Sequence, residues 1–285
     1  MEYSNPEIPE GINYSKTHPL KEFAILTTGV FGVLFIALMV IALLADHFAQ
    51  YIPFRVEKNY HILVPAQNDA PPALQEYLDG LAKRISRAEA LPPGMTITVH
   101  YVDSDIVNAY ATLGGHIVLY RGLLEKLKHE NALVMVMAHE IAHVKYRHVI
   151  RSMGSGVAVG IALSMLDSSM GDEVVNEVIG GTGRVGMLKF SRAHESQADD
   201  TALQAVQKIY GGVNGAEELF EAIKASEKLD FVPVFMRTHP GTDARIRHIQ
   251  ELERKLPSVK LTALPVQFRR WLGSEPASSS PDVTD

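Results

Sequence analysis

Cysteine is absent from the 285 residues of this chain. Disulfide bonds, thiolate metal sites and a cysteine nucleophile are therefore excluded, and any metal site has to use His, Asp or Glu side chains. Basic residues are also few, since 27 Lys and Arg stand against 33 Asp and Glu for a formal net charge of -6. Without a basic field to neutralise phosphates, nucleic acid is not expected as a partner.

Charged residues are missing from one long segment, which runs from Phe23 to Ala45. As a helix this segment would measure about 35 Å, against roughly 30 Å of hydrocarbon in a bilayer. We predict a single transmembrane anchor over 23–45, with the bilayer as a partner. A buried core helix and a cleaved signal peptide, whose apolar region is usually about 7 to 15 residues, are the alternatives. Lys and Arg are nearly balanced on the two sides and do not set the orientation.

The rest of the chain is organised around this anchor. A polar tail rich in proline precedes it, a linker with aromatic residues follows it, and one globular domain of ordinary size comes next. The predicted boundaries are 1–22 for the tail, 23–45 for the anchor, 46–70 for the juxtamembrane linker, 71–256 for the domain and 257–285 for a C-terminal tail.

The domain itself is predicted to be mainly α, with a small β-sheet. Pro71 and Pro72 can open a helix whose apolar residues recur at helical spacing as far as Ile85. Alternation in 96–102 and an apolar run in 117–120 indicate strands.

Four segments follow these strands. Asn131 is a plausible N-cap for a helix over 132–153, and another helix is expected over 191–209. Between them, 156–166 is predicted to pack on the core or to touch the membrane surface, and the glycines of 180–186 to form a connector.

The chemistry is carried by the sequence His139-Glu140-Ile141-Ala142-His143, an HExxH pattern within the predicted helix 132–153. Histidines four residues apart lie on one face of a helix, so the two imidazoles can grip one ion. Glu140 lies about 100° around the helix from His139, so its carboxylate stays free to act as the general base toward water. Zinc is the expected cofactor, with one ion per chain.

A catalytic zinc site needs a third protein ligand, for which we choose Glu195 in the next predicted helix. Asp199 lies one turn further on the same face and can accept a hydrogen bond from a ligand imidazole. Arg192, one turn before Glu195, can support a carboxylate. The alternative interpretation of these residues is an exposed helix face with paired charges.

HExxH followed by SRxxExxAD resembles the M48 family of metallopeptidases, which has HtpX-like and Oma1-like members. Two further stretches are similar to that family, namely 108–117 before the catalytic helix and 238–246 after it. The resemblance implies a mainly helical gluzincin-type domain with a small sheet, zinc, and proteolysis at or near membranes. HtpX-like members have several membrane spans, so the single predicted span places this chain nearer to the Oma1-like or single-anchor bacterial group. By that resemblance the chain would be single-pass in the bacterial inner membrane, with a periplasmic catalytic domain.

The function predicted on this basis is endoproteolysis of misfolded or membrane-associated polypeptides, bound along an edge strand near Gly115 to Leu119. Two alternatives stay open: a zinc-containing holdase or assembly factor that seldom cleaves, and a structural zinc site. His239 precedes Pro240 in a segment that resembles the family's, and it has two candidate roles. It could donate a hydrogen bond to the oxyanion, or it could fill the open zinc position as an inhibitory fourth ligand. A surface histidine without function is the third possibility.

Overall fold

The structure is a computed structural model in which the described residues are 19–49, 51–60, 63–152, 190–218, 220–221, 239 and 242–273. The predicted segments 156–166 and 180–186 lie outside them. By its contacts the chain divides into two units, residues 1–44 and residues 45–285.

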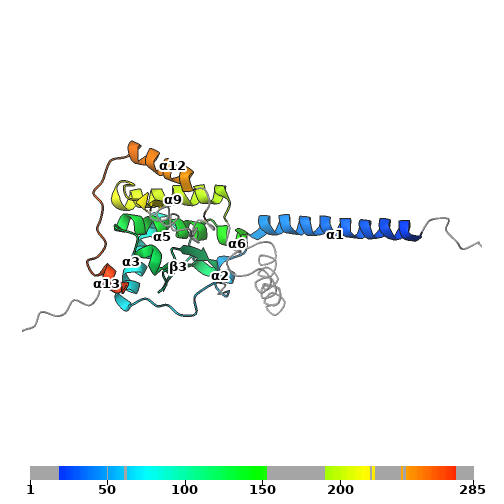
Figure 1. The fold of residues 1–285 in the computed structure, drawn as a ribbon, viewed down its shortest axis with the longest axis horizontal. Helices are drawn as coiled ribbons and strands as arrows, with labels where there is room; N and C mark the ends of the chain where they lie inside the picture. Colours follow the sequence, from blue (N-terminus) through cyan, green and yellow to red (C-terminus); the bar gives the residue numbers. More distant parts are fainter. Residues whose placement is uncertain are drawn as a thin grey trace, which may run out of the picture. The chain divides into compact units, whose positions relative to one another are not determined.

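The first unit holds most of α1 (Pro19–Ala49), a single helix that contains the predicted anchor 23–45 (Figure 1). In the part of the chain that the structure describes, no helix is both long and apolar enough to cross a membrane.

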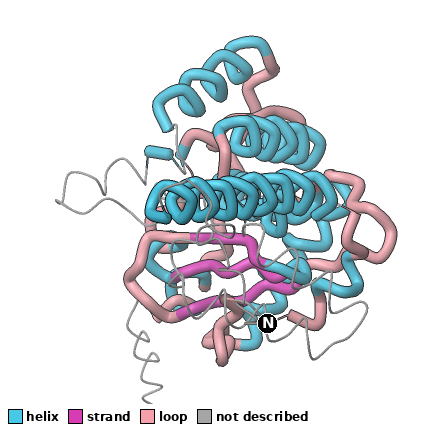
Figure 2. The backbone as a smooth tube through the Cα atoms, turned by 90° about the vertical axis from the view of Figure 1, so that its right-hand side faces the viewer, coloured by secondary structure: helices cyan, strands magenta, loops and turns pink. Residues whose placement is uncertain are grey.

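The second unit is mainly helical and contains one small sheet. In the described ranges its helices are α2 (Phe54–Glu57), α3 (Pro72–Ala88), α4 (Arg121–Leu124), α5 (Glu130–Lys145), α6 (His148–Ser152), α9 (Arg192–Tyr210), α12 (Thr242–Lys255) and α13 (Phe268–Trp271). Helices α12, α9 and α5 and the sheet form successive layers (Figures 1 and 2). The helix predicted to open at Pro71 and Pro72 is α3, whose leucines at helical spacing are buried.

Among the described residues the sheet has three strands, β1 (Thr98–Val102), β2 (Ala109–Thr112) and β3 (His116–Tyr120), in the order β1-β3-β2. Strand β3 pairs parallel with β1 and antiparallel with β2. The strand predicted to offer an edge to substrate is therefore the central one, and that prediction is wrong. Alternation within a strand indicates which residues are buried, but it does not encode the order of strands in the sheet.

Two glycines make the turn between β2 and β3. Gly114 and Gly115 have φ of 75° and 83°, a region that L side chains rarely adopt. A Cβ at Gly115 would also lie 2.1 Å from the carbonyl oxygen of Thr96. A side chain at this position would force the turn away from the segment just before β1, so glycine is required.

Helix α5 is buried on all sides, which explains why its sequence is apolar around its whole circumference apart from the HExxH residues and the polar residues at its two ends. It starts one residue before Asn131, whose side-chain oxygen accepts a hydrogen bond from the backbone N–H of Thr262 instead of capping the helix. It also ends earlier than predicted, because Arg147 has φ of 63° and breaks the helix before α6. The Arg147 guanidinium pairs with the buried Glu57 carboxylate at 2.6 Å.

Residues 257–273, assigned from the sequence to a C-terminal tail, pack against the domain. Ala263 forms a β-bridge with His129 just before α5, and the Phe268 ring is buried beside Tyr77 of α3. The folded part of the chain therefore extends beyond residue 256.

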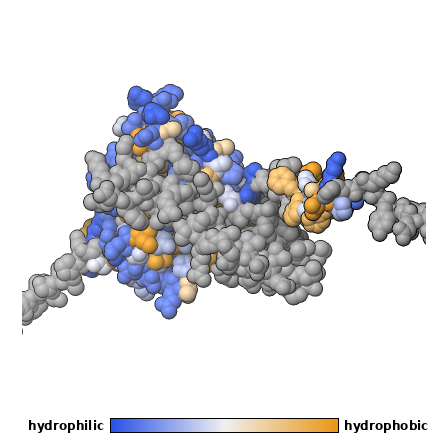
Figure 3. All heavy atoms as spheres, turned by 45° about the vertical axis from the view of Figure 1, so that its right-hand side comes forward, coloured by the Kyte–Doolittle hydropathy of each residue, from blue (hydrophilic) through white to orange (hydrophobic). Residues whose placement is uncertain are grey.

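Helix α12, at the top of Figure 3, presents mainly hydrophilic side chains on its outer face.

Candidate metal centre

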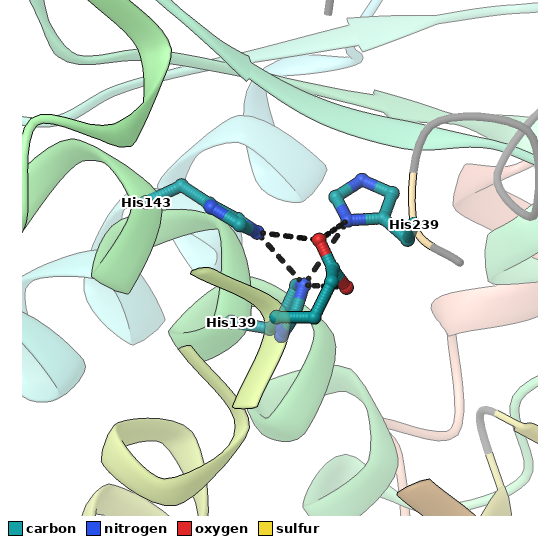
Figure 4. Close-up of side chains that lie close together, drawn as sticks. His139, His143 and His239 are labelled. Atoms are coloured by element: carbon teal, nitrogen blue, oxygen red, sulfur yellow. Dashed lines mark hydrogen bonds and ion pairs between the residues drawn. The ribbon is translucent and has the colours of Figure 1, made fainter. Parts of the chain in front are cut away.

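The two histidines of the HExxH sequence lie one turn apart in the middle of α5, with both side chains fully buried. Their Nε2 atoms are 3.0 Å apart and face the same point (Figure 4). Four-residue spacing on a helix produces this arrangement, as the sequence predicts.

Two further side chains reach the same point from other parts of the chain. Glu195 comes from the first turn of α9, whose start is set by the Ser191 hydroxyl accepting a hydrogen bond from the backbone N–H of His194 at 3.2 Å. The Glu195 Oε1 lies 3.4 Å from the His143 Nε2 and 3.0 Å from the His239 Nδ1. Together His139, His143, Glu195 and His239 offer four ligand atoms within 4.8 Å of one another, all of them buried.

The spacing of these atoms fits a tetrahedral metal ion. Ligand atoms about 2.0–2.1 Å from a tetrahedral zinc ion would be roughly 3.3 Å apart. The His139 Nε2 lies 3.2 Å from the His239 Nδ1 and 3.5 Å from the Glu195 Oε2, close to that value. Nitrogen and oxygen donors without sulfur suit zinc among the common metals. The residues present therefore fit the metal that the motif implies.

His139 is held by charged groups. Its Nδ1–H donates to the Asp199 Oδ1 at 2.9 Å, and Asp199 also receives two bonds from Arg245, at 2.6 and 2.7 Å. The Arg245 Nη1 continues to the Glu195 Oε2 at 2.7 Å. Burial lowers the pKa of His139, but Asp199 and Glu195 outweigh it and raise the pKa to about 9.

Arg245 has the corresponding effect on the acids. Burial by itself would raise the pKa of Asp199, but Arg245 and His139 hold it below the ordinary value. The pKa of Glu195 is also lowered despite burial, because three histidines surround its carboxylate.

His143 is held by neutral groups. Its Nδ1 lies 3.0 Å from the Nδ1 of the buried His148, and the His148 Nε2 lies 2.9 Å from the Gln197 Oε1. The ring of Phe190 stacks on the His143 ring with centroids 3.8 Å apart. Burial lowers the pKa of His143 well below its usual value and that of His148 to about 4.

Glu140 is the remaining polar group in this cluster. Its side chain is fully buried, and within the described part of the chain neither carboxylate oxygen has a hydrogen-bond partner. The Nε2 of His239 is 3.6 Å from its Oε1. A buried carboxylate in such a position is costly unless something else, such as a water or a substrate group, satisfies it.

The structure brings six of the seven predicted site residues together and places the seventh apart. Asp199 contacts the His139 imidazole, as predicted, whereas Arg192 lies exposed at the start of α9 and lines a surface pocket with Glu195. The guanidinium that contacts Glu195 belongs to Arg245, which sequence reasoning did not select. His148 was missed as well, although it follows His143 by only five residues.

Two histidines and a glutamate around one point, with a second glutamate beside them, match the residue set of known catalytic zinc sites. Residues 72–253 match the model of peptidase family M48. The match covers more than half of the chain, so the chain belongs to this family of peptidases.

Several curated proteins are similar to the chain. The putative beta-barrel assembly-enhancing protease of Vibrio cholerae is 29% identical over 69% of this chain and 42% of its own length. The mitochondrial metalloendopeptidase OMA1 of Schizosaccharomyces pombe is 28% identical, over 61% of this chain and 52% of its own. The metalloprotease YcaL of Escherichia coli is 27% identical, over 53% and 59%. The chain thus spans less than two thirds of each of these relatives.

Proposed function

We propose that the chain is a membrane-anchored, zinc-dependent endopeptidase that hydrolyses peptide bonds of misfolded or membrane-associated proteins. The observation that carries the proposal is the buried Glu140 carboxylate, which lacks a hydrogen-bond partner among the described residues and lies beside four buried metal-ligand atoms. A site of purely structural use would have no need of such a group. The relatives named above are themselves called proteases or metalloendopeptidases.

Each residue of the site would have a separate role in peptide hydrolysis. His139, His143 and Glu195 would hold the metal. Bound zinc supplies a Lewis acid that polarises the scissile carbonyl and makes a water molecule acidic at neutral pH. Glu140 would accept the proton of the attacking water and pass it to the leaving amine, a general-base role typically worth a factor of about 10² to 10⁴.

His239 would act as the fourth ligand of a resting site. Its Nδ1, and not its Nε2, faces the His139 Nε2 at 3.2 Å and the Glu195 carboxylate at 3.0 Å. Of the two roles expected from the sequence, this geometry supports the inhibitory ligand more than the oxyanion donor. A site closed by four protein ligands has no open position for water. Activity would then require His239 to leave the cluster.

Two rival functions make different demands on Glu140. A structural zinc site closes all four positions, as this cluster would, but gains nothing from a buried glutamate whose oxygens have no hydrogen-bond partner among the described residues. A holdase or assembly factor with the same fold would bind polypeptides without needing a general base. The position of Glu140 favours the endopeptidase over both.

Polypeptide substrates would add to β2 rather than to β3. Among the described strands β2 lies at one edge of the sheet, and it packs against helix α5. An extended peptide pairing with this edge would be bound through main-chain hydrogen bonds, with little dependence on sequence.

The anchor is proposed for residues 23–45, on the ground that the sequence has no charged residue there. The catalytic domain would face the periplasm from the bacterial inner membrane. Deletion of residues 1–45 should move the protein from the membrane fraction to the soluble fraction, and a truncated protein that stays with membranes would refute this anchor.

The central experiment measures zinc content and cleavage of unfolded casein by the full chain in detergent, beside Glu140→Gln. This variant removes the proton acceptor and none of the ligands, so zinc should stay bound while turnover falls by several orders of magnitude.

Each rival gives another result. A holdase would keep casein from aggregating equally well with either residue at position 140, without cleaving it. A structural site would bind zinc and neither cleave nor protect casein. Undiminished cleavage by Glu140→Gln would refute the proposed mechanism.

A further inference from the structure

We propose that His148 and Gln197 are positioning residues that set the tautomer of His143 and so aim its Nε2 lone pair at the metal. The inference extends the proposed zinc site to two residues that the HExxH pattern does not contain. It rests on three hydrogen-bonding groups in a row, namely the Gln197 amide, the His148 imidazole and the His143 imidazole.

The direction of each hydrogen bond follows from the group at the end of the row. The Gln197 Oε1 can only accept, so the His148 Nε2, at 2.9 Å, carries the hydrogen. A neutral His148 then has its lone pair on Nδ1 and accepts from the His143 Nδ1–H at 3.0 Å. With its hydrogen on Nδ1, His143 has a free lone pair on Nε2, the atom that faces His139 and Glu195.

His148 is kept neutral by its surroundings. The side chain is fully buried, and among the described residues it contacts uncharged groups apart from other imidazoles: the Gln197 amide, the Phe190 ring and the Tyr146 ring. A charged imidazolium among such groups would lose its hydration without gaining a carboxylate partner. The opposite arrangement, in which His148 donates to His143 and leaves the hydrogen on the His143 Nε2, would block the metal.

The break between α5 and α6 brings His148 into place. In a continuous helix a residue five positions after His143 would lie about 140° around the axis, away from the ligand face. Arg147 instead adopts φ of 63°, which turns the chain so that His148, at the start of α6, lies against His143. The backbone at Arg147 is thus strained at a point where the strain places a side chain.

Substitutions at position 197 test the direction of the hydrogen bonds that join Gln197, His148 and His143. Glutamate can only accept, but its charge also favours a protonated His148, so the test is made in alkaline buffer, at about pH 9, where His148 is neutral. Under these conditions Gln197→Glu should keep zinc affinity within about threefold of the parent. Gln197→Leu removes the acceptor, and an orienting partner of this kind typically costs 10- to 100-fold in metal affinity when lost. Affinity is measured on the full chain in detergent by competition with a chelator. Because Gln197 lies on the surface of α9, both variants should fold.

His148→Phe keeps a ring of similar size and removes both nitrogens, so it should lose affinity by the same 10- to 100-fold. His194→Phe is the matched control, since it preserves the ring stacked on His148 at 4.1 Å and should bind zinc like the parent. If His148→Phe does not fold, as judged by circular dichroism, the pair of variants at position 197 decides.

The tautomer itself is read from two-bond proton–nitrogen NMR spectra of metal-free protein with labelled histidine. The parent and Gln197→Glu should show the His143 hydrogen on Nδ1. Three outcomes would each overturn the proposal: a hydrogen on Nε2 in the parent, unchanged zinc affinity in Gln197→Leu, or equal losses in Gln197→Glu and Gln197→Leu. None of these measurements depends on proteolysis, so an inactive protein would refute the proposed function without affecting this inference.

Discussion

The two histidines of the HExxH sequence occupy one face of one helix, yet the structure supports them in different ways. His139 donates to a carboxylate that is itself paired with a buried arginine, whereas His143 faces a second imidazole and, behind it, an amide. The first support is charged and the second is neutral. Identical residues at equivalent positions of a motif therefore need not have equal strength as ligands.

The charged groups that support His139 also connect more parts of the chain. Asp199 lies on α9 and Arg245 on α12, and Arg245 further contacts Glu195 and the carbonyl oxygen of His239. The neutral support joins only α6 and α9. Removing one partner of a buried ion pair leaves an uncompensated charge, which costs about 3–5 kcal/mol, while losing a neutral hydrogen bond costs about 1–3 kcal/mol.

The largest effect is expected at Glu195, whose carboxylate faces both histidines. Glu195→Ala leaves two histidines and His239, and it strands Arg245 without one of its carboxylates. Zinc content and proteolysis should both fall, because the three histidines that remain lack the carboxylate ligand and bind the metal more weakly. Metal analysis by mass spectrometry checks this expectation. Full zinc occupancy in the variant would show that another residue is the third ligand.

The comparison itself is tested by neutralising the charged support. Asp199→Asn keeps the shape of the side chain and removes its charge, so it should lower zinc affinity about 100-fold, at the upper end of the range for such partners. Gln197→Leu, on the neutral side, should cost closer to 10-fold. Chelator competition on both variants in one buffer gives the ratio of the two losses in zinc affinity. Equal losses would mean that charge does not distinguish the two supports.

A smaller effect, opposite in sign, is expected at the fourth ligand. His239→Ala should keep zinc bound and raise casein cleavage about tenfold, because it opens a position that His239 closes. The matched control is His248→Ala, which removes an exposed histidine of α12 paired with Asp200. A fall in kcat with zinc retained would assign His239 to the oxyanion instead, and unchanged kinetics would leave it without a role.

The last effect is on folding stability and not on the metal, and it concerns a carboxyl with neither kind of support. Glu89 is 3% exposed, and within the described residues its oxygens accept no hydrogen bond. Burial raises its pKa from 4.5 to about 8, although Lys145 acts in the opposite direction. The folded state therefore holds this proton more tightly than the unfolded state. Between these two pH values stability falls as pH rises, by up to about 1.4 kcal/mol per pH unit from this group.

Glu89→Gln removes that proton, so the variant should gain stability relative to the parent as the pH is raised from about 5 to 8. Urea unfolding can be followed by the fluorescence of Trp271, the one tryptophan of the chain, which packs near Tyr77. A parent and variant with the same dependence of stability on pH would show that Glu89 is ionised in the folded protein.

Much of the domain could be predicted from local patterns, because those patterns reflect local physics. The leucine spacing of α3, the i and i+4 histidines and the helix of Glu195 and Asp199 all depend on helical periodicity. Family resemblance added the neighbourhood of His239, and the structure brings His239 to the cluster.

What could not be predicted depends on contacts between distant residues. The helix break at Arg147 is stabilised by Glu57, which lies far back in the sequence, so no pattern near His148 reveals it. Arg245 approaches Asp199 across 46 residues, and from the sequence Arg192 was the nearer candidate. The order of the strands, which put β3 in the centre, is set by pairing partners and not by the composition of any strand.

The wide separation of these contacts along the chain has a consequence for biosynthesis. The ligands come from three stretches, at 139–143, 195 and 239, and the start of α5 is bonded by its backbone to Thr262. A ribosome makes these stretches in order, so the HExxH helix emerges long before its partners exist. Until then the nascent chain has only a two-histidine site, which binds metal weakly. Late completion of the metal centre would keep the enzyme inert toward neighbouring nascent chains while it is being synthesised.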